Sequence, residues 1–272
     1  MAICASGLCE AAVDSKQSDP KQIVRLAVRT ELDANRNDHS HWLYFEVNRK
    51  PKGAVSQWVA ETSKGDVHRV VKEDARELSD AEQRARMDGF VRDSATQAKE
   101  RKAGEHDDQQ ATELLKLLPD AFIWTNTGSR NGNSVLHFKP DPKFRAPDRE
   151  ARVFASMEGD MTVNDAQHRI VSLKGRLIQD VKFGGGLFAT LKAGGTFDVE
   201  RREVGKAEWQ ITETHVHIEG HALLFKSISE QEDDVKSKFR PLPGDLTLEQ
   251  AENGLLKEGG RDSGAGQEGG SR

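Results

Sequence analysis

The sequence predicts an α+β fold in which a curved antiparallel β-sheet, shaped as a half-barrel, packs on a few helices. Apolar and polar residues alternate strictly from Met157 and again from Val171. Successive strand side chains point to opposite faces, so the alternation indicates a sheet with one apolar and one hydrated face. Glycine-containing turns separate these runs, as in antiparallel hairpins, and capping patterns mark only a few helices. About ten strands are expected.

Composition bounds the class of protein. The chain has 272 residues, of which 35% are hydrophobic, and a mean hydropathy of -0.71, so we expect a single large domain with a thin core. Lysine and arginine number 40 against 45 acidic residues, a net charge of -5, which argues against a nucleic-acid partner or an anionic membrane. No run approaches the ~20 apolar residues of a membrane span.

The first 18 residues differ from the rest. Met1–Val13 is small and apolar and resembles the last part of a secretory signal peptide, with Cys9-Glu10-Ala11 as a candidate cleavage site. This favours a periplasmic or otherwise exported protein; the alternative is an ordinary cytoplasmic terminus. Both cysteines, Cys4 and Cys9, lie here, so the body at 19–257, interpreted as one domain, is expected to have no disulfide. The glycine-rich tail at 258–272 is expected to be disordered.

The body opens with a helix and three strands. Asp19 followed by Pro20 is typical of a helix start, and this helix is expected to reach Asn35. Its inward residues are expected to be Ile23, Leu26, Ala27 and Thr30. Strand-like runs follow at His41–Asn48, Ala54–Thr62 and Val67–Glu73, separated by glycine-containing turns, and are interpreted as a β-meander.

A polar helical insertion is predicted at 79–118. Ser79 and Glu82 have the spacing of a capping box, from which a solvated helix is expected to reach about Lys102. A second helix should follow Gly104, carrying its leucines until Pro119 ends it.

Strands are predicted again from Phe122 to the end of the sheet. The proline-rich stretch Lys139–Asp148 is expected to be irregular, and a phase change near Glu213–Thr214 predicts a β-bulge. A last short helix is expected from Thr247 to about Lys257.

Two features could carry chemistry. His215, His217 and His221 lie on one face of a predicted strand, and such histidines bind zinc if a further ligand approaches from a neighbour. They fall on the polar face, so the favoured interpretation is a plain hydrated surface and no metal. The run Gly184–Gly186 could cradle an anion, but a strand rather than a helix follows it, and we expect a bend or bulge.

Aromatic and methionine side chains could line an apolar cleft. The candidate ligand-binding residues are Trp42, Tyr44, Trp58, Trp124, Met157 and Met161. Such side chains suit loosely shaped apolar ligands, although core packing accounts for them equally well. The chain contains no HExxH, Walker, GxSxG, CxxC or Rossmann glycine motif, which lowers the expectation of an enzyme and of a cofactor.

Four stretches resemble a family of uncharacterised exported bacterial proteins: Leu117–Phe122, Arg149–Phe154 with Met157–Gly159, Asp180–Leu187, and Asp245–Leu248. The likeness spans about Pro20 to Lys257. The strand layout is in turn similar to the periplasmic lipoprotein carriers, the LolA/LolB-like proteins of outer-membrane lipoprotein sorting. This resemblance implies a curved sheet that wraps around helices and holds acyl chains, and it transfers no catalytic residues.

These observations favour a non-catalytic cell-envelope protein that binds a hydrophobic or lipidic ligand, or an envelope partner such as a lipoprotein, in the concave face of its sheet. Two alternatives stay open: a metal-dependent enzyme that uses the three histidines, and an adaptor that docks through the polar helix from Ser79.

Overall fold

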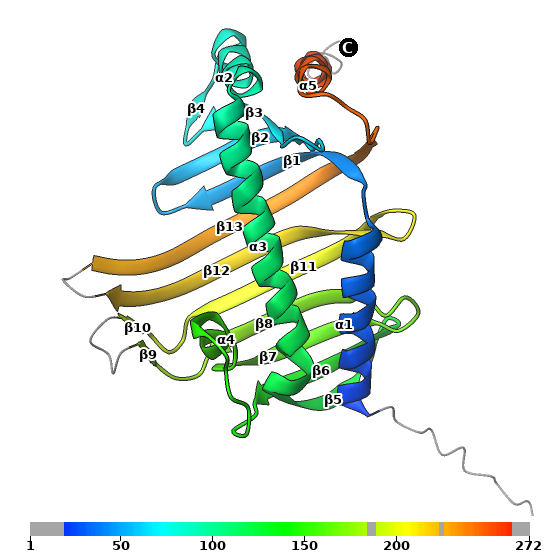
Figure 1. The fold of residues 1–272 in the computed structure, drawn as a ribbon, viewed down its shortest axis with the longest axis vertical. Coiled ribbons are helices and arrows are strands. Elements are labelled where there is room, and N and C mark those ends of the chain that lie inside the picture. Colours follow the sequence, from blue (N-terminus) through cyan, green and yellow to red (C-terminus); the bar gives the residue numbers. More distant parts are fainter. Residues whose placement is uncertain (1–18, 184–188, 223–225, 263–272) are drawn as a thin grey trace, which may run out of the picture.

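The α+β prediction is confirmed, with one large open antiparallel sheet and helices packed on it (Figure 1). The computed structural model describes residues 19–183, 189–222 and 226–262. Within them the helices are α1 (Pro20–Asn37), α2 (Asp80–Arg92), α3 (Ser94–Ala121), α4 (Arg149–Phe154) and α5 (Leu248–Asp262). Residues 1–18, with both cysteines and the predicted cleavage site, lie outside the described residues, as does the run Gly184–Gly186.

The sheet has thirteen described strands, where about ten were expected, in the order β4-β3-β2-β1-β13-β12-β11-β8-β7-β6-β5, with β10 beside β12 and β9 beside β10. The strands are β1 (His41–Lys50), β2 (Gly53–Ala60), β3 (Val67–Glu73), β4 (Arg76–Glu77), β5 (Phe122–Arg130), β6 (Asn133–Pro140), β7 (Met157–Asn164), β8 (Ile170–Leu177), β9 (Val181–Phe183), β10 (Ala189–Leu191), β11 (Thr196–Gly205), β12 (Glu208–Ala222) and β13 (Lys226–Leu242). Three of these strands, β4, β9 and β10, have only two or three residues. The predicted meander of β1, β2 and β3 is confirmed.

The helices cover opposite faces at the two ends of the sheet. Five residues on neighbouring strands are paired in turn, so their side chains lie on the same face of the sheet: Leu173 of β8, Val199 of β11, Thr214 of β12, Asp234 of β13 and Asn48 of β1. We call this the inner face. Helices α1, α3 and α4 pack on it over β5–β8, around the buried residues Leu118, Phe122, Leu136, Phe138, Met161 and Leu177. Side chains of opposite parity in β1 and β2, Leu43, Trp58 and Ala60, pack instead with α2 and α5.

Helix α1 begins as predicted, because the side chain of Asp19 accepts a hydrogen bond from the Lys21 N–H and Pro20 takes the first turn. The expected inward stripe was only partly right. Ala27 is buried as predicted, and Val24, Val28 and Glu31 are buried as well. Val24 and Glu31 each lie one residue after a predicted inward residue, Ile23 and Thr30. The reason is a charged group at a core position, which an apolar pattern does not reveal.

That group, Glu31, is 2% exposed and forms an ion-pair cluster with two arginines of the sheet. Its carboxylate accepts hydrogen bonds from Nε and Nη2 of Arg169, at 3.1 and 3.0 Å, and from the Ile170 N–H at 2.7 Å. Arg201 of β11 pairs with the same carboxylate. Burial alone would raise the pKa of Glu31, but the two guanidinium groups outweigh it and hold the pKa below its usual value. The cluster fixes α1 to β8 and β11.

The break in the polar insertion is not where we expected it. Asp93 ends α2, and its side chain accepts hydrogen bonds from the N–H groups of Ala95 and Thr96, so it caps α3. Helix α3 then continues through Gly104, which is exposed, and through Pro119, which is buried in the last turn. A glycine in an exposed helix costs only about 1 kcal/mol, too little to interrupt the helix here.

Two irregularities set which side chains reach the inner face. A register shift between Thr162 and Val163 brings Ile170 into the core, so that Val171, predicted there, is only half-buried. The bulge predicted near Glu213 is confirmed, since the register shifts between that residue and Ile211. The short helix α4 was not expected, and α5 runs to Asp262, five residues past the predicted end.

A pair of glycines lets β7 and β8 approach closely. Gly159 and Gly175 lie directly opposite each other. A Cβ at Gly159 would lie 1.9 Å from the carbonyl oxygen of Lys174, and one at Gly175 would lie 2.5 Å from the ring of Phe197. The first contact is with backbone and cannot be relieved by a rotamer change, so any side chain there must separate the strands.

We therefore predict that Gly159→Ala lowers the free energy of unfolding by at least about 2 kcal/mol. Gly89→Ala is the matched control: Gly89 is exposed in α2 with no atom near its would-be Cβ, so alanine should stabilise by about 0.5–1 kcal/mol. Urea denaturation checks both, and an unchanged midpoint for Gly159→Ala would contradict the close approach.

A second prediction concerns the Glu31 cluster. Glu31→Gln leaves two buried guanidinium groups without their counter-charge and should cost about 3–5 kcal/mol at pH 7. Because the folded pKa of Glu31 is lowered, its contribution is present above the unfolded value and is lost as pH falls through the folded one. The difference between wild type and variant should shrink in acid. Glu158→Gln, which breaks an exposed pair with Arg176, should cost at most about 1 kcal/mol.

Candidate ligand-binding cavity

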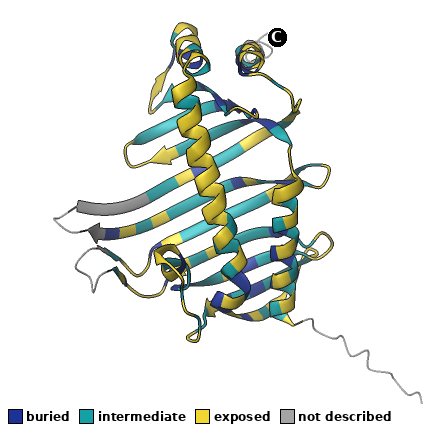
Figure 2. Cartoon of the chain, in the orientation of Figure 1, coloured by how far each residue is buried: buried dark blue, intermediate teal, exposed yellow. Residues whose placement is uncertain are grey.

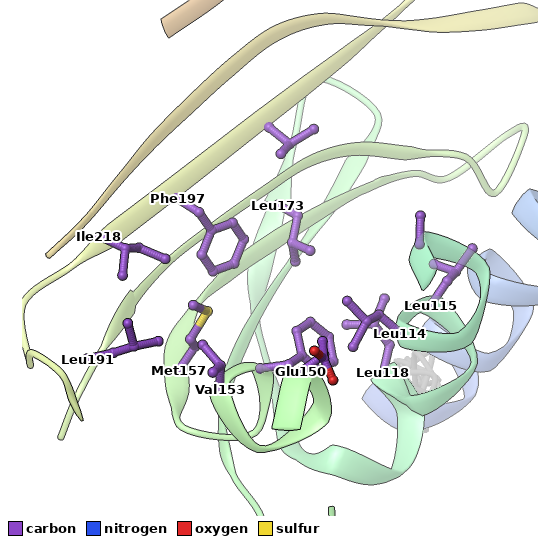
Figure 3. A pocket seen from close by; sticks show the side chains of 13 residues that line it. Leu114, Leu115, Leu118, Glu150, Val153, Met157, Leu173, Leu191, Phe197 and Ile218 are labelled. Atoms are coloured by element: carbon purple, nitrogen blue, oxygen red, sulfur yellow. The ribbon is translucent and has the colours of Figure 1, made fainter. Parts of the chain in front are cut away.

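An apolar cavity of about 560 Å³ lies between the inner face of the sheet and the helices α3 and α4. Figure 3 shows side chains from both layers pointing into it. The lining residues are Ala111, Leu114, Leu115, Leu118, Glu150, Val153, Phe154, Met157, Leu173, Leu191, Phe197, Val199 and Ile218. Glu150 is the one charged residue among them. The volume is within the range typical of small-molecule sites, and so is the mostly apolar lining.

The strand periodicity supplies the floor of this cavity. Leu173, Phe197 and Ile218 belong to β8, β11 and β12 and are half-buried, packed at the margin of the core (Figure 3). The ring of Phe197 rests over Gly175, where a Cβ would collide with it. The glycine therefore gives the phenyl ring its place in the floor of the cavity.

Helix α3 forms the roof. Its last two turns pack on α1 and α4, and its start packs on α2, whereas residues 98–111 are all exposed (Figure 2). The solvated helix predicted from Ser79 to about Lys102 is thus confirmed over 98–102, but it is wrong for α2, where Met87 is buried in a core. With 28 residues the helix is about 42 Å long, and it crosses the inner face between its two supports (Figure 1).

A second cavity, of about 680 Å³, lies between α1 and α3 and is polar. It shares Ala111 with the apolar cavity, so the two adjoin beneath α3. Its lining comprises Leu32, Asn35, Arg36, Asp38, Ser40, Glu61, Asp108, Gln109, Ala111, Thr112, Lys116 and Gln210. We call it the polar cavity.

Glu61 is the most perturbed acid of the polar cavity. Its carboxylate accepts a hydrogen bond from the Trp42 N–H at 2.8 Å. Burial raises its pKa to about 7, and the nearby carboxylate of Asp66 adds to the effect, while Lys236 opposes it. On the same face, burial and the carboxylate of Glu46 raise the pKa of Asp234 to about 6. The inner face is thus apolar over β5–β8 and acidic towards β1.

This raised pKa gives a testable pH dependence. The folded protein holds the Glu61 proton more tightly than the unfolded chain, so wild-type stability falls as pH rises from the unfolded value, near 4.5, to about 7. Glu61→Gln keeps an acceptor for the Trp42 N–H and carries no charge. The variant should gain roughly 1–3 kcal/mol relative to wild type over that range in urea titrations at several pH values. A constant difference would show that Glu61 titrates normally. Glu105→Gln, in the exposed part of α3, is the control.

Of the six candidate ligand-binding residues, Met157 lines the apolar cavity and the other five are not among its lining residues. Trp42 and Tyr44 are buried on the inner face against Phe239. Trp58 is buried on the opposite face with α2 and α5. Trp124 and Met161 are buried in the larger core, where the Trp124 indole donates to the carbonyl of Leu118.

The histidines of β12 lie on the face opposite the cavity. Nδ1 of His215 is 2.6 Å from Asp233, and this hydrogen bond raises the pKa of His215. His217 is exposed, with Nε2 3.2 Å from the Gln231 side chain. The side chain of His221 is outside the described residues. Among all the residues that the structure describes, no group of three or more His, Cys, Asp or Glu side chains could hold a metal ion.

The charges of this opposite face form an ordered row. From β6 to β1 the directly paired residues are His137, Asp160, Lys174, Asp198, His215, Asp233 and Arg49, so basic and acidic residue types alternate along the row. Lys174 lies 3.0 Å from Asp198. Opposite charges on paired strands stabilise a sheet, and we attribute the row to that role.

The residues of α3 and α4 that line the apolar cavity were not among the ligand-binding residues predicted from the sequence. Leu114, Leu115 and Leu118 carried a signal, a helical apolar stripe, but the stripe does not say whether its partner is core or cavity.

No described helix is long and apolar enough to cross a bilayer. No protein-family model, curated protein or solved structure matches the chain.

Proposed function

We propose that this protein is a non-catalytic binding protein that holds a hydrophobic or lipidic ligand in the apolar cavity between its sheet and α3. One observation carries the proposal: a cavity of about 560 Å³ in which a single charged residue, Glu150, stands among twelve uncharged, almost wholly apolar neighbours. Transfer of apolar surface from water into such a site is favourable by roughly 25 cal/mol per Å². The amino-terminal segment and the resemblance to exported proteins support a site of action in the cell envelope, which belongs to the same proposal.

The architecture supports binding over catalysis. The residues around the cavity supply packing surface, and neither a nucleophile nor a general base is among them besides the carboxylate of Glu150. The roof helix lines the cavity with Ala111 and its leucines, while the preceding residues 98–110 are exposed.

Ligand binding is tested by blocking the cavity. Leu114→Trp places an indole at a half-buried lining position and should abolish or strongly weaken the binding of a fluorescent apolar dye. Ala103→Trp puts the same ring on the exposed part of α3 and should bind as wild type does. Native mass spectrometry should in addition show lipid adducts on wild type and not on Leu114→Trp. Equal dye binding by both variants would exclude this cavity as the site.

A chain-length series gives an independent check. Each methylene buried is worth about 0.8 kcal/mol, so the Kd of straight-chain ligands should fall about fourfold per added carbon until the cavity is filled. Isothermal titration calorimetry measures the series. Affinity that does not depend on chain length would contradict burial of the chain.

A role in partner binding is the second candidate. Residues 98–111 of α3 form an exposed, mixed-charge surface of the kind that an adaptor would use. Lipid adducts would then be missing, and binding to a partner would survive Leu114→Trp.

A further inference from the structure

We infer that the ligand is a single-chain amphiphile with a cationic head group, whose chain occupies the apolar cavity and whose ammonium group occupies the polar cavity. The inference rests on the proposed function and adds the chemistry of the head group. It follows from three features: the junction of the two cavities, the charged residues that line the polar cavity, and whether each of those residues has an ion-pair partner.

The junction is formed by α3. Ala111 borders both cavities, and its methyl group is the smallest side chain that the helix presents there. Leu114, Leu115 and Leu118 of α3 line the apolar cavity, whereas Asp108, Thr112 and Lys116 line the polar one. One helix thus presents an apolar and a polar side to adjoining spaces, the arrangement that an amphiphile requires.

The cations of the polar cavity are already neutralised. Arg36 pairs with Asp33 of its own helix, and Lys116 lies 2.7 Å from Glu113. A carboxylate or phosphate head group would have to displace these partners. The lining is therefore a poor match for a fatty acid or an anionic lipid.

The acids of the polar cavity have no such partners. Asp38, Glu61 and Asp108 form no ion pair with any described residue. Three carboxylates around one space create a negative potential that favours a cation. Asp38 and Asp108 are exposed, whereas Glu61 is partly buried in the wall.

Glu61 faces charges from several elements. Asp66 and Asp38 disfavour its ionisation, the Trp42 N–H favours it, and Lys236 is the cation that acts on it most. An ammonium group in the polar cavity would supply the missing counter-charge and release the proton that Glu61 retains near neutral pH.

The experiment compares three monomeric ligands with one chain length, tetradecylamine, tetradecanoic acid and tetradecan-1-ol, by isothermal titration calorimetry on the full-length protein. With ion pairs worth about 0.2–1 kcal/mol each, three carboxylates should give the amine an affinity about 3- to 150-fold above the alcohol. The acid should bind more weakly than the alcohol.

Adjacent aspartates give a matched pair of variants. Asp108→Asn should weaken the amine about two- to fivefold and leave the alcohol unchanged, whereas Asp107→Asn, next along the helix and outside the cavity lining, should change neither. Ala111→Trp should obstruct the junction and weaken all three ligands.

The outcomes separate the two proposals. If all three ligands bind with equal affinity, or if the acid binds best, the cationic head group is wrong and the proposed function stands. If Asp108→Asn weakens the alcohol as much as the amine, the polar cavity does not hold the head group. If none of the ligands binds, both proposals fall.

Discussion

The site depends on one buried ion-pair cluster, in which Glu31 of α1 meets Arg169 and Arg201 of the sheet. An isolated helix laid on a wide apolar surface could slide, because dispersion and hydrophobic contacts are not directional. The carboxylate and its two guanidinium partners make the docking directional. Helix α1 then supports the last turns of α3, and α3 in turn closes the space above β8 and β11. A charge cluster therefore determines where an apolar cavity forms.

The inner face is larger than the helices that cover it. Over β5–β8 the helices α1 and α4 and the end of α3 pack directly on the strands, which gives the main core. Towards β1 and β13 the face carries carboxylates, amides and Lys236 beside a small core cluster of Trp42, Tyr44 and Phe239, and the larger core of β1–β3 lies on the opposite side. This division is consistent with the low mean hydropathy of the chain, because part of the wide inner face carries polar side chains.

Strand rhythm predicted the sheet well because its signal is local: Met157, Met161 and Leu177 all lie on the apolar face, and all are buried. Val171 was predicted to be buried, but Ile170 is buried instead. The cause is a register shift between β7 and β8, which depends on how the two strands pair and leaves no local pattern in the sequence of either one. Glu31 was missed for the same reason, since its partner Arg169 is distant in the chain. Most of the aromatic residues proposed for a cleft are buried in cores. A cavity forms where two layers do not fill the space between them, and the composition of the chain does not indicate where this happens.

Residues 98–111 of α3 are exposed, so their helical structure rests largely on local propensity and on the two anchored ends. Helices without tertiary support are marginal in water, and the midpoint of this one is Gly104. Fraying here starts in the centre rather than at the termini. Such a break would uncouple the two anchored ends of α3 at a small fraction of the free energy that global denaturation requires, and it would leave the hydrophobic cores intact.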